Sequence, residues 1–333
     1  MILVTGGAGY IGSHTVVALI DAGYEVFVLD DFSNSVVQTL DHVFKMTGTS
    51  VEYCVGSIND SLLLRSIFEK YDIKSVIHFA GLKSVSDSLT SPMSYYDVNV
   101  KGTMCLLQEM ERASVFDFIF SSSATVYGNP VELPISENHP LGEALNPYGQ
   151  TKQIVELMLN DLVNSNTCWN VGILRYFNPI GAHSSGFLGE NPRGQATNVM
   201  PLLMKAAYGE SPYLSVFGDT HGTADGTGVR DYIHVMDLAS GHISALNYIA
   251  KHGGLNTWNL GTGKGYSVLE LIRSFESVTG IELKFQMSPK RRGDVAICFA
   301  DPSKANLELN WMAQFDLDVM ISDSWKAFLN FKA

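Results

Sequence analysis

The sequence predicts an α/β protein with a doubly wound parallel sheet and a smaller α/β domain after it. Short β-branched apolar runs alternate with amphipathic helical patterns over the first half of the chain. A glycine-rich turn separates the first strand from the first helix. The alternation stops near residue 180, where Gly, Pro and polar residues become frequent. We therefore expect one domain over 1–179, rejoined by about 235–261, and a second domain over 180–333.

The first elements are a strand, a glycine turn, a helix and a second strand. The apolar run 1–5 predicts the first strand, and the pattern after the turn predicts a helix that ends at Gly23. A strand over 26–29 follows, with Asp30 and Asp31 at its end. This order is typical of a Rossmann-type dinucleotide-binding unit.

The glycine turn predicts a pyrophosphate site. Its glycines, Gly6, Gly9 and Gly12 among them, permit a tight turn and let backbone N–H groups approach phosphate at the helix N-terminus. The carboxylate of Asp30 can accept hydrogen bonds from an adenosine ribose and repels a 2′-phosphate. We therefore expect NAD as the cofactor and not NADP.

The remaining elements alternate as this fold requires. Asp60 or Ser61 can cap a helix that runs through Lys70. A long helix is predicted over about 92–113. Further apolar runs predict strands over 51–55, 75–81, 118–120 and 171–175.

Later segments are also predicted to be regular. A helix over 235–249 and a strand over 257–261 would rejoin the first domain. Ser267 and Glu270 fit a capping box that opens a helix to about Thr279, and we assign that helix a structural role.

Composition limits the class of protein. The 333 residues suffice for a large α/β unit and a smaller one, and the net charge of −12 argues against nucleic-acid binding. No apolar run has the length of a membrane span and no signal peptide precedes the first strand, so we expect a cytoplasmic protein without membrane contact. The four scattered cysteines indicate reduced thiols. The nine histidines show no metal-binding spacing, so we expect no catalytic metal.

A tyrosine and a lysine stand four residues apart at Tyr148 and Lys152. Pro147 before them favours the first turn of a helix. Positions i and i+4 share one face of a helix, so the ammonium of Lys152 can lie near any ligand that meets the phenol of Tyr148. A nearby cation lowers the pKa of a tyrosine, which makes Tyr148 usable as a general base near neutral pH.

The chain resembles the extended short-chain dehydrogenases/reductases and, among them, the UDP-glucose (UDP-galactose) 4-epimerases. The resemblance runs nearly end to end. The motifs that carry it are TGGAGYIGSHT at 5–15, HFAGLKSV at 78–85, FSSSATVYG at 120–128, NPYGQTK at 146–152, LRYFNPIGAH at 174–183 and DGTGVRDYIHVMDLA at 225–239.

This resemblance implies NAD-dependent 4-epimerisation of UDP-hexoses. Tightly bound NAD would accept a hydride from C4 while Tyr148 takes the 4-OH proton, and the resulting 4-keto sugar would turn over and regain the hydride on its other face. Lys152 would tune Tyr148 and anchor the cofactor, and Ser123 would hydrogen-bond the C4 oxygen. The resemblance also implies a homodimer built from helices of the first domain.

The resemblance, with the glycine turn, also assigns residues to the two ligands. Two arginines suit a diphosphate, because guanidinium forks match phosphate oxygens. The residues expected around NAD are Gly6, Gly9, Tyr10, Ile11, Gly12, Asp30, Asp31, Asn34, Ser57, Ile58, Phe79, Ala80, Gly81, Lys83, Asn99, Ser121, Tyr148, Lys152 and Phe177. Those expected around the UDP-sugar are Ser123, Tyr148, Asn178, Asn198, Val199, Val216, Phe217, Arg230, Arg291, Asp294 and Cys298.

Two positions depart from the family pattern. Ser57 follows the third strand where many relatives carry an acid that contacts adenine, so adenine is held here without that charge. Cys298 stands where bacterial relatives restricted to glucose and galactose carry tyrosine. A cysteine leaves a larger pocket, which implies that UDP-GlcNAc and UDP-GalNAc are also substrates. The alternative is that Cys298 is a small buried residue whose neighbours fill the gap.

Two other functions have to be compared with epimerisation. Sugar-nucleotide 4,6-dehydratases share the fold and the tyrosine–lysine pair but need an Asp-Glu pair just after the Ser/Thr. Here those positions are Ala124 and Thr125, which cannot transfer protons in that way. A non-catalytic NAD-binding protein typically loses the tyrosine or the lysine, and this chain keeps both.

Overall fold

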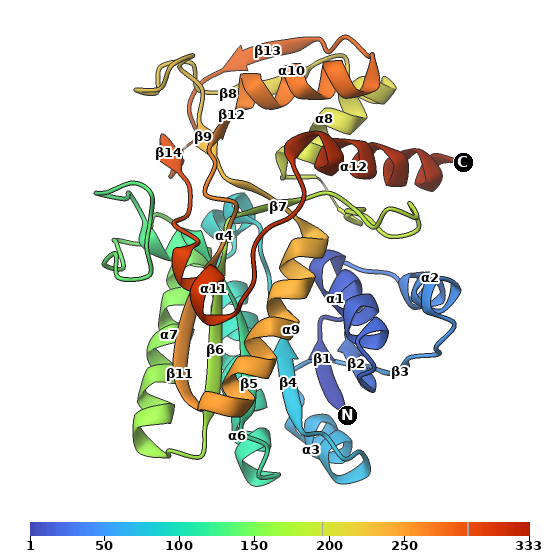
Figure 1. Ribbon diagram of the computed structural model, residues 1–333, viewed down its shortest axis with the longest axis vertical. Coiled ribbons are helices and arrows are strands. Elements are labelled where there is room, and N and C mark those ends of the chain that lie inside the picture. The colour runs from blue at the N-terminus through green and yellow to red at the C-terminus, as the bar shows by residue number, and fades with distance from the viewer. Residues whose placement is uncertain (195, 292) are drawn as a thin grey trace.

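Alternating strands and helices build a seven-stranded parallel sheet in the computed structural model, which describes residues 1–194, 196–291 and 293–333. The strand order is β11-β6-β5-β4-β1-β2-β3, and every neighbouring pair is parallel. The elements that follow residue 180 lie mostly above the carboxyl ends of these strands (Figure 1). The predicted doubly wound α/β class is therefore confirmed.

Each strand of the sheet overlaps a strand predicted from the sequence. The predicted strand over 75–81 ends early, at His78, because the N–H groups of Phe79 and Ala80 both donate to the carbonyl oxygen of Thr5 and turn the chain across the end of β1. The observed bounds are β1 Ile2–Thr5, β2 Val26–Asp30, β3 Glu52–Val55, β4 Ser75–His78, β5 Asp117–Ser123, β6 Asn170–Tyr176 and β11 Gly254–Leu260.

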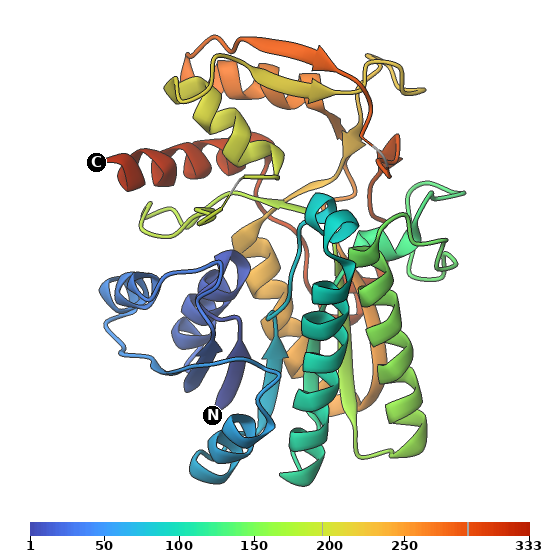
Figure 2. The same cartoon turned by 180° about the vertical axis from the view of Figure 1, so that it is seen from behind.

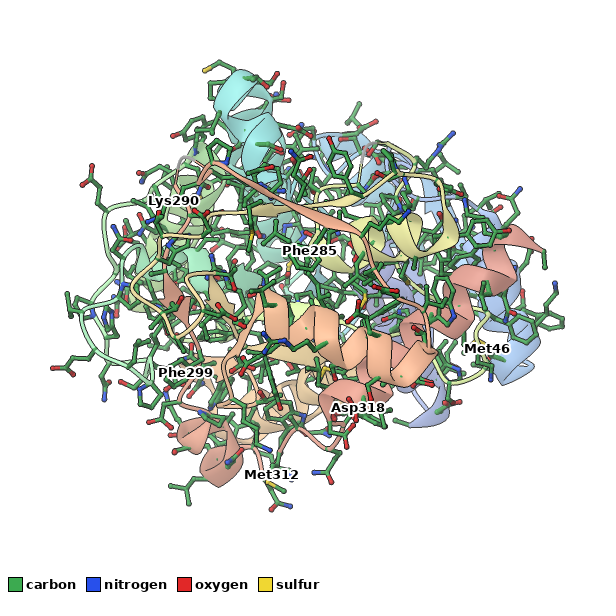
Figure 3. All side chains as sticks on the ribbon, turned by 90° about the horizontal axis from the view of Figure 1, so that it is seen from above. Met46, Phe285, Lys290, Phe299, Met312 and Asp318 are labelled. Carbon is green, nitrogen blue, oxygen red and sulfur yellow. The ribbon has the colours of Figure 1, made fainter. Side chains whose placement is uncertain are left out.

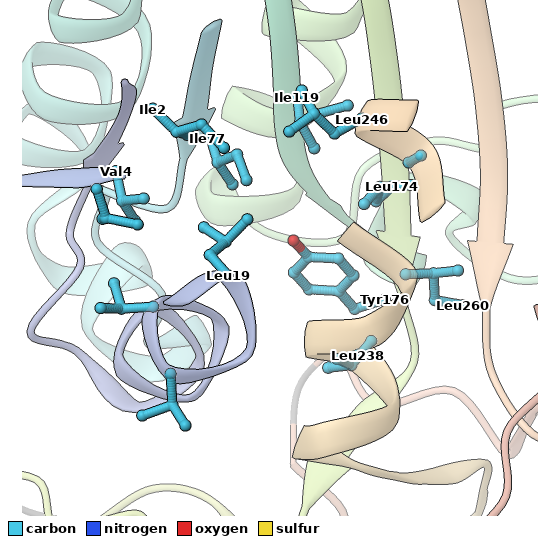
Figure 4. Packing of buried hydrophobic residues seen from close by; sticks show 14 of the residues in the cluster. Ile2, Val4, Leu19, Ile77, Ile119, Leu174, Tyr176, Leu238, Leu246 and Leu260 are labelled. Carbon is cyan, nitrogen blue, oxygen red and sulfur yellow. The ribbon is translucent and has the colours of Figure 1, made fainter. Parts of the chain in front are cut away.

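Helices cover both faces of the sheet, because alternate strand residues point to opposite sides and both sides are apolar. Val4 and Leu174 face the front of Figure 1 and pack in one cluster with Leu19 and Leu246 (Figure 4). Leu3 belongs to the cluster on the opposite face. The front helices are α1 Tyr10–Asp21, α2 Gln38–Thr47 and α9 Val235–His252, and the helices seen from behind in Figure 2 are α3 Ser61–Lys70, α6 Thr103–Arg112 and α7 Pro147–Ser165.

The predicted helix over 92–113 is interrupted by π-helical geometry. Helix α5 (Pro92–Tyr95) runs into a π-helix, η1 (Tyr96–Gly102), and then into α6. A π-helix inserts an extra residue per turn and often marks a functional position. Here it contains Asn99.

Capping explains where several helices begin. Asp60 accepts hydrogen bonds from the first-turn N–H groups of α3, and Asn146 accepts one from Gly149 at the start of α7. Ser267 and Glu270 form the predicted capping box of α10 (Val268–Thr279). These predicted helix starts are confirmed.

The chain after residue 180 builds small sheets and helices around a third apolar cluster. Seen from above, Phe285 lies on a strand of this part, Lys290 beyond the end of that strand and Asp318 on the last helix (Figure 3). The strand pairs are β7 (Asn178–Ile180) with β10 (Tyr232–His234), β8 (Leu214–Phe217) with β13 (Phe285–Ser288), and β9 (Val229–Arg230) with both β12 (Tyr266–Ser267) and β14 (Ile297–Cys298). Besides α10, the helices around this cluster are α8 Val199–Tyr208 and α12 Leu317–Lys332, whereas α11 Ser303–Glu308 contributes Ala305 to the first cluster.

No helix within residues 1–194, 196–291 and 293–333 is both long enough and apolar enough to cross a membrane.

Candidate active site

Two loops meet where the winding of the sheet reverses, between β1 and β4. Gly6 has a φ of +70°, and a Cβ added to it would lie 2.7 Å from the backbone nitrogen of Ala80. A Cβ on Gly12 would lie 2.2 Å from the carbonyl oxygen of Gly6. Only glycine fits these positions, so the glycine turn can pack closely at the crevice where open α/β sheets bind ligands.

Helix α1 begins with no side-chain cap. Its N-cap is Gly9, and its first turn holds no acidic residue. The first-turn N–H groups, which include those of Tyr10 and Ile11, are therefore available to an anion. The Tyr10 hydroxyl donates to the carbonyl oxygen of Gly181 at 2.7 Å and ties this turn to the later part of the chain.

Asp30, at the end of β2, is buried and accepts three hydrogen bonds. Its Oδ2 accepts from the N–H of Ala8 at 2.9 Å. Its Oδ1 accepts from the N–H of Phe32 at 2.9 Å and from the Ser35 hydroxyl at 2.8 Å. The carboxylate thus fixes the glycine turn to the loop after β2. Two more residues predicted around the cofactor are exposed on this loop, Asp31 and Asn34.

The segment after β3 carries the two residues predicted near adenine. Ser57 Oγ accepts a hydrogen bond from the N–H of Asn59 at 3.2 Å. Ile58 is buried in the cluster on the rear face of the sheet. Asp30 and Val55 are register partners, so Ser57 lies two residues beyond the level of Asp30 at the same edge. Its contact with adenine stays a prediction.

Asn99 holds the loop after β4. Its Oδ1 accepts from the N–H of Leu82 at 2.7 Å, and its Nδ2 donates to the carbonyl oxygen of Leu82 at 2.9 Å. Nδ2 also donates to the Thr151 hydroxyl at 3.0 Å and so links the loop to α7. The residues of this loop predicted around the cofactor are Phe79, Ala80, Gly81 and Lys83.

The three predicted catalytic residues meet between β5 and α7. Lys152 Nζ donates to the carbonyl oxygen of Ser121 at 2.6 Å and lies 5.9 Å from the ring centroid of Tyr148. Ser123 is the last residue of β5. Its hydroxyl lowers the pKa of the Tyr148 phenol, although burial of the phenol has the larger, opposite effect. The spacing of the tyrosine and the lysine therefore predicted their shared face correctly.

The predicted lowering of the tyrosine pKa is wrong for the protein alone. Burial raises the pKa of Tyr148 to about 12, and the Ser123 hydroxyl opposes that rise. Burial also lowers the pKa of Lys152 to about 8, which the carboxylate of Glu156 opposes. The desolvation of the phenolate outweighs the lysine, whose ammonium is bound to the Ser121 carbonyl.

Cys298 is the last residue of the short strand β14. It is buried in an apolar cluster with Ala124 and Phe177. Its partner in the register of β14 and β9 is Arg230. Burial raises the pKa of the Cys298 thiol to about 11, so the side chain is neutral at physiological pH.

The two arginines predicted to bind the diphosphate lie on different elements. Arg230 is the last residue of β9, and Arg291 follows β13. Arg230 Nη1 donates to the carbonyl oxygen of Ala296 at 3.4 Å. The guanidinium of Arg291 lies 3.8 Å from the ring centroid of Phe217. Burial lowers the pKa of Arg291, and the carboxylate of Asp294 opposes this shift.

The other residues predicted around the UDP-sugar lie on β7, β8 and α8. The N–H of Asn178 donates to the carbonyl oxygen of Asp231 at 2.9 Å. Asn198 is the N-cap of α8, which starts at Val199, and its Nδ2 donates to Glu190 Oε1 at 2.6 Å. Val216 is buried in β8.

Sequence reasoning missed two charged groups at the site. Glu190 also accepts a hydrogen bond from Lys83 Nζ at 3.1 Å, and nothing in its Gly- and Pro-rich surroundings signals this role. Glu156 forms a buried fork with Arg175, at 3.1 and 2.6 Å, and accepts from the Ser122 hydroxyl at 2.5 Å. Glu156 stands one turn after Lys152 on α7, and that spacing could have identified it.

Comparison with protein families gives one match over most of the chain. Residues 3–324 match the family model described as GDP-mannose 4,6 dehydratase. The mouse UDP-glucose 4-epimerase is 50% identical over 331 residues, which cover 98% of this chain and 95% of the mouse protein.

Solved structures agree with this match. The UDP-glucose 4-epimerase of Bifidobacterium longum, in complex with NAD⁺ and UDP, has a TM-score of 0.97 and 46% identity, over 99% of this chain and 98% of that one. The UDP-Glc/GlcNAc 4-epimerase of Campylobacter jejuni has a TM-score of 0.85 and 33% identity, over 99% of both chains.

Proposed function

Because the chain belongs to the UDP-glucose 4-epimerase family of the extended short-chain dehydrogenases/reductases, we propose that it interconverts UDP-glucose and UDP-galactose. The observation that carries this proposal is the meeting of Tyr148, Lys152 and Ser123 at the carboxyl end of β5. The experiment that tests it is incubation of the purified protein with UDP-galactose, without added cofactor or reductant. Epimerisation gives UDP-glucose. A dehydrated keto product or no product would contradict the proposal.

The cofactor is NAD, and the residues at the sheet edge fit it. The uncapped first turn of α1 offers N–H groups to a pyrophosphate, and Gly6 and Gly12 leave room for its approach. Asp30 presents a carboxylate where an adenosine ribose is held in this fold. Bound NAD supplies a hydride acceptor and donor for C4 of the hexose, so that the reaction needs no net redox partner.

Tyr148 would accept the proton of the 4-hydroxyl and return it to the C4 oxygen when the hydride comes back to the other face of C4. A phenol with a pKa of about 12 stays protonated near neutral pH, so positive charge near it is needed before it can ionise and act as a base. Lys152 carries such a charge below its pKa of about 8. Ser123 would hold the C4 oxygen within reach of the phenol by hydrogen bonding.

Anchoring would fall on the nucleotide, because the hexose has to turn over between the two hydride transfers. Arg230 and Arg291 would pair with the diphosphate as charge-assisted forks. Neither guanidinium is paired with a carboxylate among the described residues: Arg230 Nη1 donates to the carbonyl oxygens of Val229 at 2.8 Å and Ala296 at 3.4 Å, and Arg291 lies on the face of Phe217. The other proposed contacts to the UDP-sugar are Asn178, Asn198, Val199, Val216 and Asp294.

We also propose that UDP-GlcNAc and UDP-GalNAc are substrates. Cys298 shares an apolar cluster with Ala124, the residue after Ser123, and is the register partner of Arg230, so we place it near both the reacting group and the diphosphate. Its small side chain leaves room for an N-acetyl group on C2. The C. jejuni relative, described as a UDP-Glc/GlcNAc 4-epimerase, supports this range for the fold.

The fold suggests that the two ligands bind to different parts of the chain. We propose that residues 1–179, with about 235–261, bind NAD and that 180–333 bind the UDP-sugar. β11 lies in the main sheet beside β6, which supports the return of the chain to the first part. The free thiols of all four cysteines support a cytoplasmic location.

A homodimer is proposed through α6 and α7. Met104 on α6 and Leu157 on α7 are apolar and exposed. A depression of about 110 Å³ between these helices is lined by Met104, Leu107, Gln108, Glu111, Met158 and Leu162. An apolar surface of this kind on parallel neighbouring helices suits a two-fold contact with a second copy.

The alternative function, a sugar-nucleotide 4,6-dehydratase, needs an Asp-Glu pair directly after Ser123, and this chain does not have one there. Ala124 and Thr125 begin the short 3₁₀-helix η2 (Ala124–Tyr127) directly after Ser123. Neither side chain can donate or abstract a proton as a carboxyl group does.

A further inference from the structure

The connection between β7 and α8 touches the loops proposed to hold NAD. It passes between α12 and the helices α1 and α2 (Figure 1). The carbonyl oxygen of Gly181 accepts from Tyr10 on the first turn of α1. Arg193 Nη1 donates to the carbonyl oxygens of Phe32, at 2.8 Å, and Ser35, at 3.4 Å, on the loop after β2. The connection therefore crosses from the sugar side of the molecule onto the cofactor side.

Glu190 makes the central contact of this connection. Its Oε1 accepts from Lys83 Nζ at 3.1 Å and from Asn198 Nδ2 at 2.6 Å. Lys83 is a proposed NAD residue and Asn198 a proposed UDP-sugar residue. One carboxylate oxygen therefore joins a group from each ligand site.

The second carboxylate oxygen of Glu190 is also placed for binding. The side chain is 7% exposed, and Oε2 is buried with no hydrogen-bond partner among the residues that the structure describes. Glu190 is also one of the residues that line a cavity of about 10 Å³, together with Tyr10, Gly181 and Ser324. A buried acceptor without a donor is unfavourable, because it has lost its hydrogen bonds to water. Oε2 is thus ready to accept from a group that binds at this junction.

We propose that Glu190 is a positioning residue that couples the NAD site to the UDP-sugar site, a role that rests on the proposed function. Binding of UDP orders Asn198, Asn198 orders the Glu190 carboxylate, and the carboxylate fixes the otherwise exposed Lys83 over the cofactor. The ligand that binds first then lowers the cost of ordering these side chains for the second. Thermodynamic reciprocity requires NAD to strengthen UDP binding by the same factor.

In this chain the coupling would help to retain NAD. Ser57 offers adenine no charge, so the contacts beyond the adenosine contribute more to retaining the cofactor. Arg193 fastens the same connection to the loop that carries Asp31 and Asn34. Retention of NAD between turnovers then depends on both ends of the connection.

The test is exchange of bound NAD in the intact holoprotein against excess isotope-labelled NAD, followed by mass spectrometry. UDP is the probe for the second site. In the wild type we expect UDP to slow exchange by about fivefold or more, the lower end of usual coupling between sites. In Glu190→Gln, an isosteric change that removes the charge, the effect of UDP should fall below about twofold, and UDP should bind correspondingly more weakly by calorimetry.

Two further variants separate coupling from stability. Glu210→Gln makes the same change in the Glu210–Lys332 ion pair, which includes no residue proposed to bind either ligand, and should exchange like the wild type. The single variant Lys83→Met should already remove the slowing of NAD exchange by UDP. The double variant Lys83→Met/Glu190→Gln should then behave like Lys83→Met. If UDP changes the half-time of NAD exchange by the same factor in the wild type and in Glu190→Gln, the proposal is overturned. Neither readout needs turnover, so failed epimerisation would contradict the proposed function without deciding this test.

Discussion

Lys152 Nζ donates a hydrogen bond of 2.6 Å to the carbonyl oxygen of Ser121, two residues before Ser123. One turn later on α7, Glu156 accepts a hydrogen bond of 2.5 Å from the hydroxyl of Ser122. Helix and strand are therefore fixed to each other at successive residues. This contact sets where Tyr148 stands relative to Ser123.

Tyr148→Phe should remove most turnover and leave NAD binding intact. The ring is kept and the ionisable oxygen is lost, and a positioned acid–base group contributes about 10²–10⁴-fold. The measurements are kcat with UDP-galactose and the NAD content of the purified protein. A variant that kept more than about half of the wild-type kcat would remove Tyr148 from the proposed mechanism.

Lys152→Met should move the pH–rate profile to higher pH. The substitution removes a cation that lies 5.9 Å from the ring centroid of Tyr148, so we expect the pKa of Tyr148 to rise further and a higher pH to be needed to ionise it. The profile is measured from pH 6 to 10 in both proteins. If its position does not change while the free energy of unfolding falls, Lys152 has a structural role only.

The purified protein should contain NAD and need none added, because the reaction releases no net electrons. Asp30→Asn should narrow the preference for NAD over NADP by about tenfold, the factor that 1.4 kcal/mol of charge repulsion represents. Affinities of the reconstituted proteins for both nucleotides test this. Wild-type protein that purified empty and preferred NADP would contradict both the cofactor and the role of Asp30.

Cys298→Tyr should abolish turnover of UDP-GlcNAc and leave most of the turnover of UDP-galactose. The tyrosine ring would overlap the N-acetyl group, and overpacking of this kind costs about 1–3 kcal/mol or more. The specificity change comes from a repulsive group and not from a new attraction. The values of kcat/KM for both substrates measure it, with Cys298→Ser as the control of similar size. Wild-type protein that epimerised UDP-galactose but not UDP-GlcNAc would show that other residues close the pocket.

Stability should fall as the pH is lowered from 6.5 to 4. Burial lowers the pKa of His242 from 6.5 to about 4, so in this window the unfolded chain binds a proton that the folded chain does not. His242→Gln should flatten the dependence of the unfolding free energy by about 1.4 kcal/mol per pH unit. Urea titrations at several pH values measure both slopes. Equal slopes in the two proteins would mean that His242 is not buried in its neutral form.

Local sequence patterns predicted most of the sheet and the shared face of Tyr148 and Lys152, because both depend on spacing along one element. The π-helical turn at Asn99 could not be predicted, since its apolar pattern matches that of an ordinary helix. The raised pKa of Tyr148 was missed because desolvation depends on residues from distant segments. Glu190 was missed for a related reason. Its partner Lys83 is distant in the sequence, and its partner Asn198 is separated from it by an irregular segment without a repeating pattern.

The order of strands in the sheet has a consequence for synthesis of the chain. β6 (Asn170–Tyr176) is an interior strand only because β11 (Gly254–Leu260) pairs with its outer edge. A nascent chain that has emerged only through β6 therefore carries an open strand edge, which can pair with another chain. About eighty more residues must leave the ribosome before this edge is covered. Premature termination between the two strands should consequently yield aggregates and not a smaller folded protein.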